Sequence, residues 1–269
     1  MNKIKSPYII KQVFENVKNR IMLNILKYNK ILLDKLNITI EDYKYEHIRD
    51  FNERFQLNIK NTDVKELNLS FKNMTDKDLD YFDKYKFNRL VILNLSINKL
   101  TNIKILEKLK LEELKELNLR GNNISDINLL EKLNIKKLEK LNLSANKISD
   151  INILEKIDIK ELKELDLSNN KISDINVLKN VNFKNLEKLS LAWNEISDIT
   201  ILEKVDLKEL KELNLEHNNI SDIKVFEKAN FNNLKFLDLS YNKCEKKDFD
   251  YSSLKSKIKK IKKIYCCNI

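Results

Sequence analysis

The chain contains 269 residues, and 42% of them are hydrophobic, which is enough for a sizeable core. It has one glycine, Gly121, and one proline, Pro7. This composition excludes nucleotide-binding and calcium-binding loops, because those loops need several glycines. The net charge of +10 comes from the two ends, since residues 64–242 hold equal numbers of basic and acidic side chains. We therefore expect no nucleic acid on the central part of the chain.

The cysteine content and the hydropathy favour a cytosolic or nuclear protein, and we predict a cytoplasmic location. Cys244, Cys266 and Cys267 are an odd number near the C-terminal end, which makes a poor disulfide framework and fits a reducing compartment. The first residues are basic but lack a continuous apolar core, and no apolar run reaches the roughly 18 residues of a membrane span. We expect a chain without an export signal.

Residues 1–60 are predicted to form a small helical N-terminal element. Ser6 and Pro7 make a good helix start, apolar residues follow at helical spacing to about residue 37, and Glu41–Phe55 adds to the element. The spacing resembles an F-box through Pro7, Ile10, Val13, Phe14, Val17, Leu23 and Leu26. This resemblance implies that residues 1–40 dock to a ubiquitin-ligase adaptor. The alternative is a helical cap over the open end of the repeats that follow.

Residues 61–269 contain a repeat of constant period. The leading leucines recur every 24 residues at Leu90, Leu114, Leu138, Leu162, Leu186, Leu210 and Leu234. Each unit reads Leu-x-x-Leu-x-Leu-x-x-Asn-x-Ile, as in Leu138–Ile148, and an atypical first unit begins at Val64. A fixed period of this length indicates a solenoid, here of about eight repeats.

The columns of the repeat predict its architecture. Alternating leucines such as Leu141 should point inward and stack between parallel strands. The segment Ile124–Lys132 should form a short convex helix, capped by Ser or Asp, whose Ile127, Leu130 and Leu133 face inward. The asparagine column should turn inward and satisfy backbone groups where each strand ends. It comprises Asn98, Asn122, Asn146, Asn170, Asn194, Asn218 and Asn242.

This repeat resembles the leucine-rich-repeat family, in the short class of the phosphatase-1 regulatory subunit and of bacterial internalins. The resemblance implies an α/β solenoid with a curved parallel sheet on the concave side and short helices on the convex side. It also implies a concave face that binds another protein. It does not identify that partner.

Two outward positions of each strand carry charges whose sign inverts from repeat to repeat. They read Lys115-Glu116, Glu139-Lys140, Lys163-Glu164, Glu187-Lys188 and Lys211-Glu212. Each charge should therefore face its opposite on the neighbouring strand, in pairs worth about 0.2–1 kcal/mol when exposed. We interpret these columns as a self-satisfied surface that sets the register. Direct contact with a partner is the alternative.

Binding specificity is expected where the pattern breaks. The position before the asparagine reads Phe71, Ile97, Gly121, Ala145, Asn169, Trp193, His217 and Tyr241. The last three residues should form an aromatic stripe, and aromatic side chains dominate interface energetics. The predicted contact residues are Trp193, His217 and Tyr241, together with Arg120, Glu216 and Phe236 on adjacent outward columns. The alternative is that the rings only pack over the strand edge.

The C-terminal end is predicted to close the core with a degenerate ninth strand, in which Ile258 and Ile261 follow Leu234 and Leu237 by one period. The last four residues, which begin at Cys266, resemble a prenylation box with a polybasic flank. This resemblance implies a lipid on Cys266 and membrane contact through the basic tail. Alternatively, the lysines decorate a capping strand.

No pattern in the chain predicts catalysis. The two histidines, His47 and His217, lack metal-ligand spacing, and we find no nucleophile elbow and no paired carboxylates outside the repeating columns. We therefore predict no enzymatic activity, no metal and no cofactor. The favoured function is a cytoplasmic scaffold that binds another protein. The alternatives are an F-box-type substrate receptor and a membrane-tethered adaptor.

Overall fold

The structure is a computed structural model. It describes residues 40–79, 81–82, 85–229, 231–244 and 263–265. The chain divides into two compact units, Met1–Thr62 and Asp63–Ile269. The F-box-like pattern before residue 40 and the proposed lipid site Cys266 lie outside the described residues.

The first unit contains helix α4, which spans Ile40–Phe55 and confirms the helix predicted over Glu41–Phe55. It ends at Gln56, whose φ of 50° places it in the left-handed region. The backbone N–H of Leu57 then donates to the Asn52 carbonyl at 2.9 Å, which satisfies one of the last free carbonyls of the helix.

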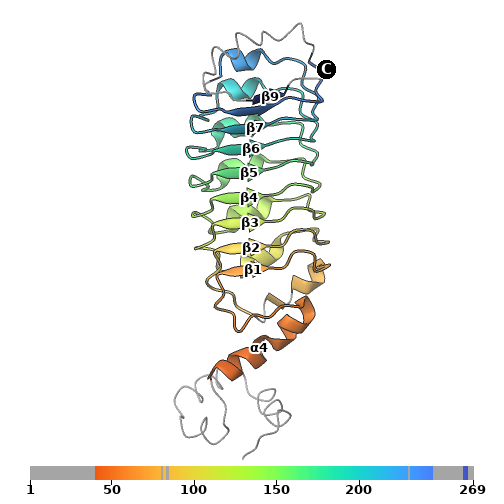
Figure 1. Ribbon diagram of the computed structural model, residues 1–269, viewed down its shortest axis with the longest axis vertical. Coiled ribbons are helices and arrows are strands. Elements are labelled where there is room, and N and C mark those ends of the chain that lie inside the picture. Colours follow the sequence, from red (N-terminus) through yellow and green to blue (C-terminus); the bar gives the residue numbers. More distant parts are fainter. Residues whose placement is uncertain (1–39, 80, 83–84, 230, 245–262, 266–269) are drawn as a thin grey trace, which may run out of the picture. The chain divides into compact units, whose positions relative to one another are not determined.

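The second unit is built on one sheet of nine parallel strands that follow one another in chain order (Figure 1). The strands are β1 (Glu66–Asn68), β2 (Ile92–Asn94), β3 (Glu116–Asn118), β4 (Lys140–Asn142), β5 (Glu164–Asp166), β6 (Lys188–Ser190), β7 (Glu212–Asn214), β8 (Phe236–Asp238) and β9 (Lys263–Tyr265). Leu117 pairs with Leu141, and Leu141 pairs with Leu165, so the leucines of neighbouring strands stack as predicted. Each of these three side chains is 1% exposed, and together with its equivalents it forms a continuous core.

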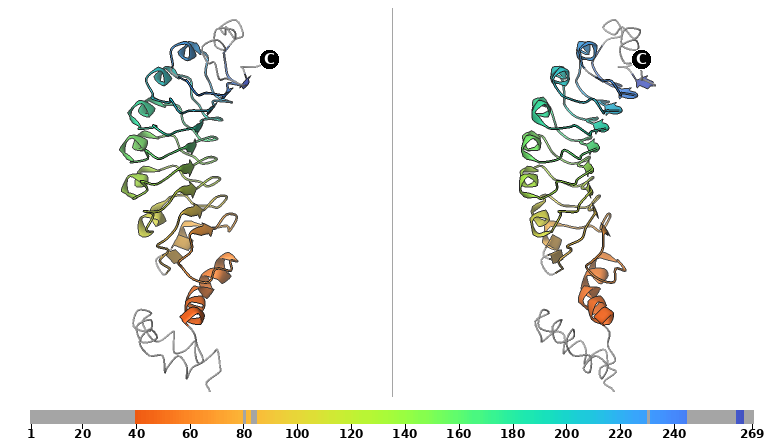
Figure 2. Two further views of the ribbon diagram at one scale, coloured as in Figure 1. Left: turned by 60° about the vertical axis from the view of Figure 1, so that its left-hand side comes forward. Right: turned by 90° about the vertical axis from the view of Figure 1, so that its left-hand side faces the viewer.

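The strands line the inner side of a curved array, as Figure 2 shows. Successive repeats stack closely on the strand side and spread apart on the opposite side, which produces the curvature. The α/β solenoid predicted from the repeat is therefore confirmed, and strands β2 to β8 follow one another at the constant 24-residue step.

The inward asparagines hold the bend after each strand. At Asn170, Nδ2 donates to the carbonyls of Leu143, Leu167 and Ser168 at 3.0, 3.0 and 3.2 Å. The Oδ1 atom accepts the backbone N–H of Ile148 at 3.0 Å. The same pattern recurs along the asparagine ladder, which is the column from Asn98 to Asn242. These side chains satisfy backbone groups that the bend leaves unpaired, as predicted.

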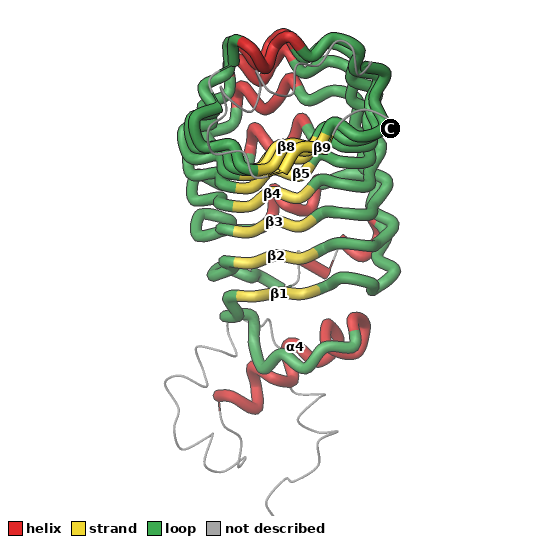
Figure 3. Tube along the Cα trace, turned by 45° about the horizontal axis from the view of Figure 1, so that its top comes forward, coloured by secondary structure: helices red, strands yellow, loops and turns green. Residues whose placement is uncertain are grey.

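The short helices predicted on the convex side are present, and they are 3₁₀ helices (Figure 3). They are η1 (Asp76–Leu79), η2 (Lys104–Lys108), η3 (Asn128–Lys132), η4 (Asn152–Lys156), η5 (Asn176–Asn180), η6 (Thr200–Glu203) and η7 (Lys224–Glu227). A segment of four or five residues is too short to repay the nucleation of an α-helix, whereas i→i+3 bonds close within it. In η3, for example, the N–H of Leu130 donates to the Ile127 carbonyl at 3.0 Å.

Of the two predicted capping residues, Asp is the acceptor in these turns. Asp126 Oδ1 accepts the backbone N–H of Asn128 at 2.8 Å, and the later repeats repeat this bond. At Asp198, the N–H and hydroxyl of Thr200 also hold the pKa of the carboxyl below its usual value. As predicted, Ile127 and Leu130 face the core, since they are 2% and 0% exposed.

The predicted ninth strand exists, but its predicted register was wrong. Ile264 of β9 pairs with Leu237, the place we assigned to Ile261. The chain between β8 and β9 is therefore three residues longer than one 24-residue period requires. A period extrapolated from regular repeats cannot reveal such an insertion.

One finding corrects the interpretation of the cysteines. Cys244 is 8% exposed and is disulfide-bonded. The cysteines therefore do not support a reducing compartment, and the cytoplasmic location stays a prediction. Within the part of the chain that the structure describes, no helix is both long and apolar enough to span a membrane.

Candidate functional site

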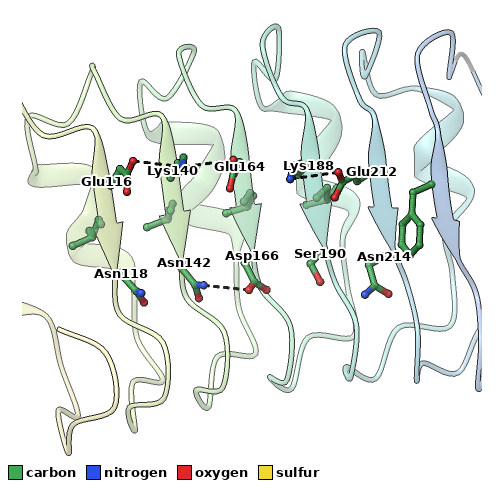
Figure 4. Close-up of a pocket in the computed structure, with 15 residues that line it drawn as sticks. Glu116, Asn118, Lys140, Asn142, Glu164, Asp166, Lys188, Ser190, Glu212 and Asn214 are labelled. Carbon is green, nitrogen blue, oxygen red and sulfur yellow. Dashed lines mark hydrogen bonds and ion pairs between the residues drawn. The ribbon is translucent and has the colours of Figure 1, made fainter. Parts of the chain in front are cut away.

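A shallow groove runs across the concave face of the sheet from β3 to β8. Its volume is about 380 Å³, and outward side chains of six neighbouring strands line it (Figure 4). Because each strand has three residues in parallel register, equivalent side chains form columns that run across the strands. Two of these columns line the groove, and further columns lie at the turn that follows each strand.

The charged columns neutralise themselves. Lys115 and Lys163 donate to Glu139 from either side at 2.7 and 2.6 Å. These two bonds hold the pKa of the Glu139 carboxyl down to about 2. The residue after Glu139 is Lys140, and its Nζ lies 3.6 Å from Glu116 Oε1 and 3.7 Å from Glu164 Oε1. Figure 4 shows both contacts. The predicted alternation of ion pairs between strands is therefore confirmed.

The same alternation continues in the later repeats. Lys188 lies 3.4 Å from Glu212, and Lys211 lies 2.7 Å from Glu187. The Lys211 contact lowers the pKa of Glu187. Such exposed pairs contribute at most about 1 kcal/mol each. Because opposite charges face each other only in this register, they favour it and leave little net charge in these columns.

A second column of the groove consists of amide, carboxylate and hydroxyl side chains that the sequence analysis did not single out. It runs through Asn118, Asn142, Asp166, Ser190 and Asn214 (Figure 4). In the asparagines, Oδ1 accepts the backbone N–H two residues later, at 3.0 Å in Asn118 and 2.9 Å in Asn214. This bond fixes the amide orientation, so that Nδ2 is the outward donor. In Asn142, Nδ2 donates to Asp166 Oδ2 at 3.2 Å, and in Asn118 and Asn214 it is left to donate to a ligand. The periodic Asn or Asp between the two inward leucines was the signal that could have revealed this column.

The aromatic stripe forms a continuous stack. The rings of Trp193 and His217 lie 3.6 Å apart between centroids at 22°, and those of His217 and Tyr241 lie 4.1 Å apart at 12°. Trp193 and Tyr241 are 52% and 56% exposed. We call these three residues the aromatic stack. The rings cover one another's faces and leave their edges open to solvent.

The backbone of this column has an unusual conformation that the sequence did not reveal. All eight residues have a positive φ of 51–66°. We call them the turn column: Phe71, Ile97, Gly121, Ala145, Asn169, Trp193, His217 and Tyr241. The left-handed region costs a residue other than glycine about 1–2 kcal/mol. Gly121, Ala145 and Asn169 adopt this turn, so it does not require a large side chain.

The turn column also carries exposed apolar side chains. Among the described residues, four large hydrophobic side chains are exposed, namely Phe71, Ile97, Trp193 and Tyr241. All four belong to the turn column, two in the first repeats and two in the late repeats. Exposed apolar side chains that gather on one edge are typical of a protein-binding surface.

The remaining predicted contact residues lie in two places. Glu216 directly precedes His217, and its Oε1 lies 3.8 Å from His217 Nε2. Phe236 is half-buried at the start of β8 and lines the end of the groove. Arg120 is exposed after β3, several strands away from the aromatic stack. The structure therefore groups Glu216 with the aromatic stack and separates Arg120 from it.

Among the described residues, no group of three or more His, Cys, Asp or Glu side chains is placed to hold a metal ion. The groove is open, and the Lys and Glu side chains that line it from β3 to β7 pair with one another. This arrangement offers large contact area and hydrogen bonds, which are the requirements of recognition.

A parallel-strand solenoid with inward leucines, an asparagine ladder and short convex turns defines the class of leucine-rich-repeat proteins. The comparisons agree with this assignment. A family model described as Leucine Rich repeats (2 copies) matches residues 112–156 and 160–204, and a single Leucine Rich repeat matches residues 208–223. The chain is a leucine-rich-repeat protein. No curated protein matches its sequence.

Solved structures share the fold. Internalin C2 of Listeria monocytogenes is 21% identical with a TM-score of 0.64, and the match covers 86% of this chain and 97% of that one. The Listeria internalin inlF is 22% identical with a TM-score of 0.56, over 83% of this chain and 74% of that one. A plant peptide hormone receptor, solved in complex with RGF2, is 20% identical with a TM-score of 0.51, over 68% and 29% of the two chains.

Proposed function

We propose that the chain is a non-enzymatic interaction module that binds another protein on its concave face and along the turn column. The observation that carries this proposal is the position of the four exposed large hydrophobic side chains, all on one edge of the sheet. The turn adopts the same backbone with Gly121 or Asn169, so the turn does not account for Trp193 or Tyr241 at this position. A binding role accounts for them, because Trp and Tyr supply most of the energy in many interfaces.

The fold supports this proposal. A peptide hormone receptor of the same fold was solved in complex with RGF2, and our proposal assigns binding of the same general kind to this chain. The open groove beside the stack provides contact area, and its outward amides can donate to a bound backbone.

Affinity purification with quantitative mass spectrometry tests the proposal. The wild-type chain is compared with a Trp193→Ala, Tyr241→Ala variant, which keeps a side chain that this turn accepts, since Ala145 occupies it. A matched control carries Lys132→Ala and Glu131→Ala on the convex turn η3. Loss of two hot-spot residues should weaken capture of the specific partner by at least roughly 30-fold, which corresponds to about 2 kcal/mol.

The convex control should capture the partner as the wild type does. Far-UV circular dichroism of each variant checks that the array is folded. Equal capture by the aromatic variant and the control would show that the binding site lies elsewhere.

A further inference from the structure

Beside the self-neutralised columns, a few charged side chains of the concave face have no counter-charge. The Arg120 guanidinium makes no hydrogen bond or ion pair within the part of the chain that the structure describes. In the late repeats, Glu216 has only the 3.8 Å contact to His217, which is beyond hydrogen-bond distance. Asp238 Oδ1 accepts the backbone N–H of Ser240 at 2.9 Å, and Oδ2 has no partner among the described residues. Among the described residues, Arg120 in an early repeat is therefore a cation without a counter-charge, and Glu216 and Asp238 in the late repeats are carboxylates without one. Asp166, between them, also has no ion pair, but its oxygens accept hydrogen bonds from Ser168 and Asn142.

In the repeat that carries Arg120 and in the repeat before it, two outward amides are oriented as donors. The Oδ1 atoms of Asn94 and Asn118 accept the N–H groups of Ser96 and Arg120, each at 3.0 Å. Their Nδ2 atoms are thereby fixed as outward donors without an acceptor in the described chain. The next residue, Gly121, has no side chain to cover the guanidinium. Two amides and a guanidinium together suit a carboxylate, which accepts and is negatively charged.

The surroundings of Glu216 favour the opposite charge. Glu216 lies beside the aromatic stack, and its side chain is 28% exposed. Ala192 holds the equivalent position in the preceding repeat, so no long side chain flanks Glu216 there. A guanidinium or ammonium group can pair with the carboxylate while its aliphatic stem packs on the exposed ring edges.

We propose that the partner contributes a segment that lies across the strands in one direction. An acidic side chain of this segment pairs with Arg120, and a basic side chain pairs with Glu216. This inference rests on the proposed function and adds the chemistry and the direction of the bound segment. Arg120 and Glu216 occupy equivalent positions in repeats four strand spacings apart, roughly 19 Å at ~4.8 Å per strand. An extended segment covers that distance with about 6 residues, and a helix with about 13.

Selection from a phage-displayed library of random 16-residue peptides on the immobilised full chain tests the proposal. Sequencing of the bound pool should show an acidic and a basic position enriched in the same order along the peptides. Their separation should be about 6 residues for an extended segment or about 13 for a helix. In Arg120→Glu, the acidic enrichment should become basic while the basic enrichment persists. In Glu216→Lys, the basic enrichment should become acidic while the acidic enrichment persists. Each charge reversal should weaken the binding of peptides selected on the wild-type chain by roughly tenfold or more.

Lys110→Glu and Glu131→Lys, in the loop before β3 and on the convex turn η3, are the matched controls and should leave the pool unchanged. Enrichment that does not respond to Arg120→Glu or to Glu216→Lys would overturn the proposed polarity and leave the proposed function intact. If the wild-type chain enriches no peptides beyond those that the empty support retains, the proposed function and this inference are both overturned.

Discussion

The asparagine ladder allows a stability prediction in which the effect of one side chain can be counted bond by bond. Asn170→Ala removes three donor bonds and one acceptor bond. The carbonyls of Leu143 and Leu167 keep a second donor, because Asn146 and Asn194 also bond to them. The N–H of Ile148 keeps none, since Asn170 Oδ1 is its acceptor in the structure.

The expected cost follows from this count. One buried N–H without a partner costs about 1–3 kcal/mol, and the lost donor bonds add about 1 kcal/mol in net terms. We therefore expect Asn170→Ala to lower the free energy of unfolding by about 2–4 kcal/mol. Asn142→Ala is the matched control, because this half-buried side chain faces the groove and water can replace its bonds. The control should cost less than about 1 kcal/mol.

Urea unfolding measures both variants. Far-UV circular dichroism follows the whole array, and fluorescence of Trp193, the only tryptophan, follows one repeat. Coincident transitions would justify a single free energy, which repeat arrays do not always allow. Equal losses from Asn170→Ala and Asn142→Ala would refute the bond-by-bond reasoning.

Two further predictions concern the turn column and pH. Gly121→Ala should lower the free energy of unfolding by about 1–2 kcal/mol, because Gly121 has a φ of 66° and an added Cβ would lie 3.2 Å from Ile97 Cγ1. Ala145→Gly should raise the free energy of unfolding by up to about 1 kcal/mol, because glycine relieves the backbone strain but loses more conformational entropy on folding. If urea unfolding shows that both variants gain stability, or that both lose it, the strain argument is contradicted. The pKa of Glu139 is lowered from 4.5 to about 2, so its pairing stabilises the fold fully above pH 4.5 and is lost as pH falls through 2. The difference in stability between wild type and Glu139→Gln should shrink over that window, and an NMR titration midpoint of the Glu139 carboxyl near 4.5 would contradict it.

Features that repeat were predictable from the sequence. A constant 24-residue step fixes the register of neighbouring strands, so the stacking of Leu117 on Leu141 follows from the spacing alone. The ion pairs around Glu139 follow from the same register, once the sign inversion along the chain is noticed. In each case one repeat predicts the contacts of the next.

Features that depend on the backbone were not predictable. Glycine in a sequence usually indicates a positive φ. Seven of the eight turn-column positions hold Phe, Ile, Ala, Asn, Trp, His or Tyr, so the residue types do not indicate the left-handed backbone. The choice between an α-helix and a 3₁₀ turn on the convex side depends on a segment of only four or five residues. The register of β9 was missed because the period changes there.

The 24-residue register also explains how stability and recognition are kept apart in this protein. The ladder around Asn170 is buried and bonds to backbone atoms, so its bonds do not depend on which residue occupies the turn column. From Phe71 to His217, each turn-column backbone N–H bonds to a carbonyl of the next repeat, as Trp193 does to Glu216 at 2.8 Å. Large side chains in consecutive repeats are thereby held one strand apart, close enough for rings to stack. A change at Trp193 or Tyr241 should therefore alter the proposed binding surface and leave the register of the array unchanged.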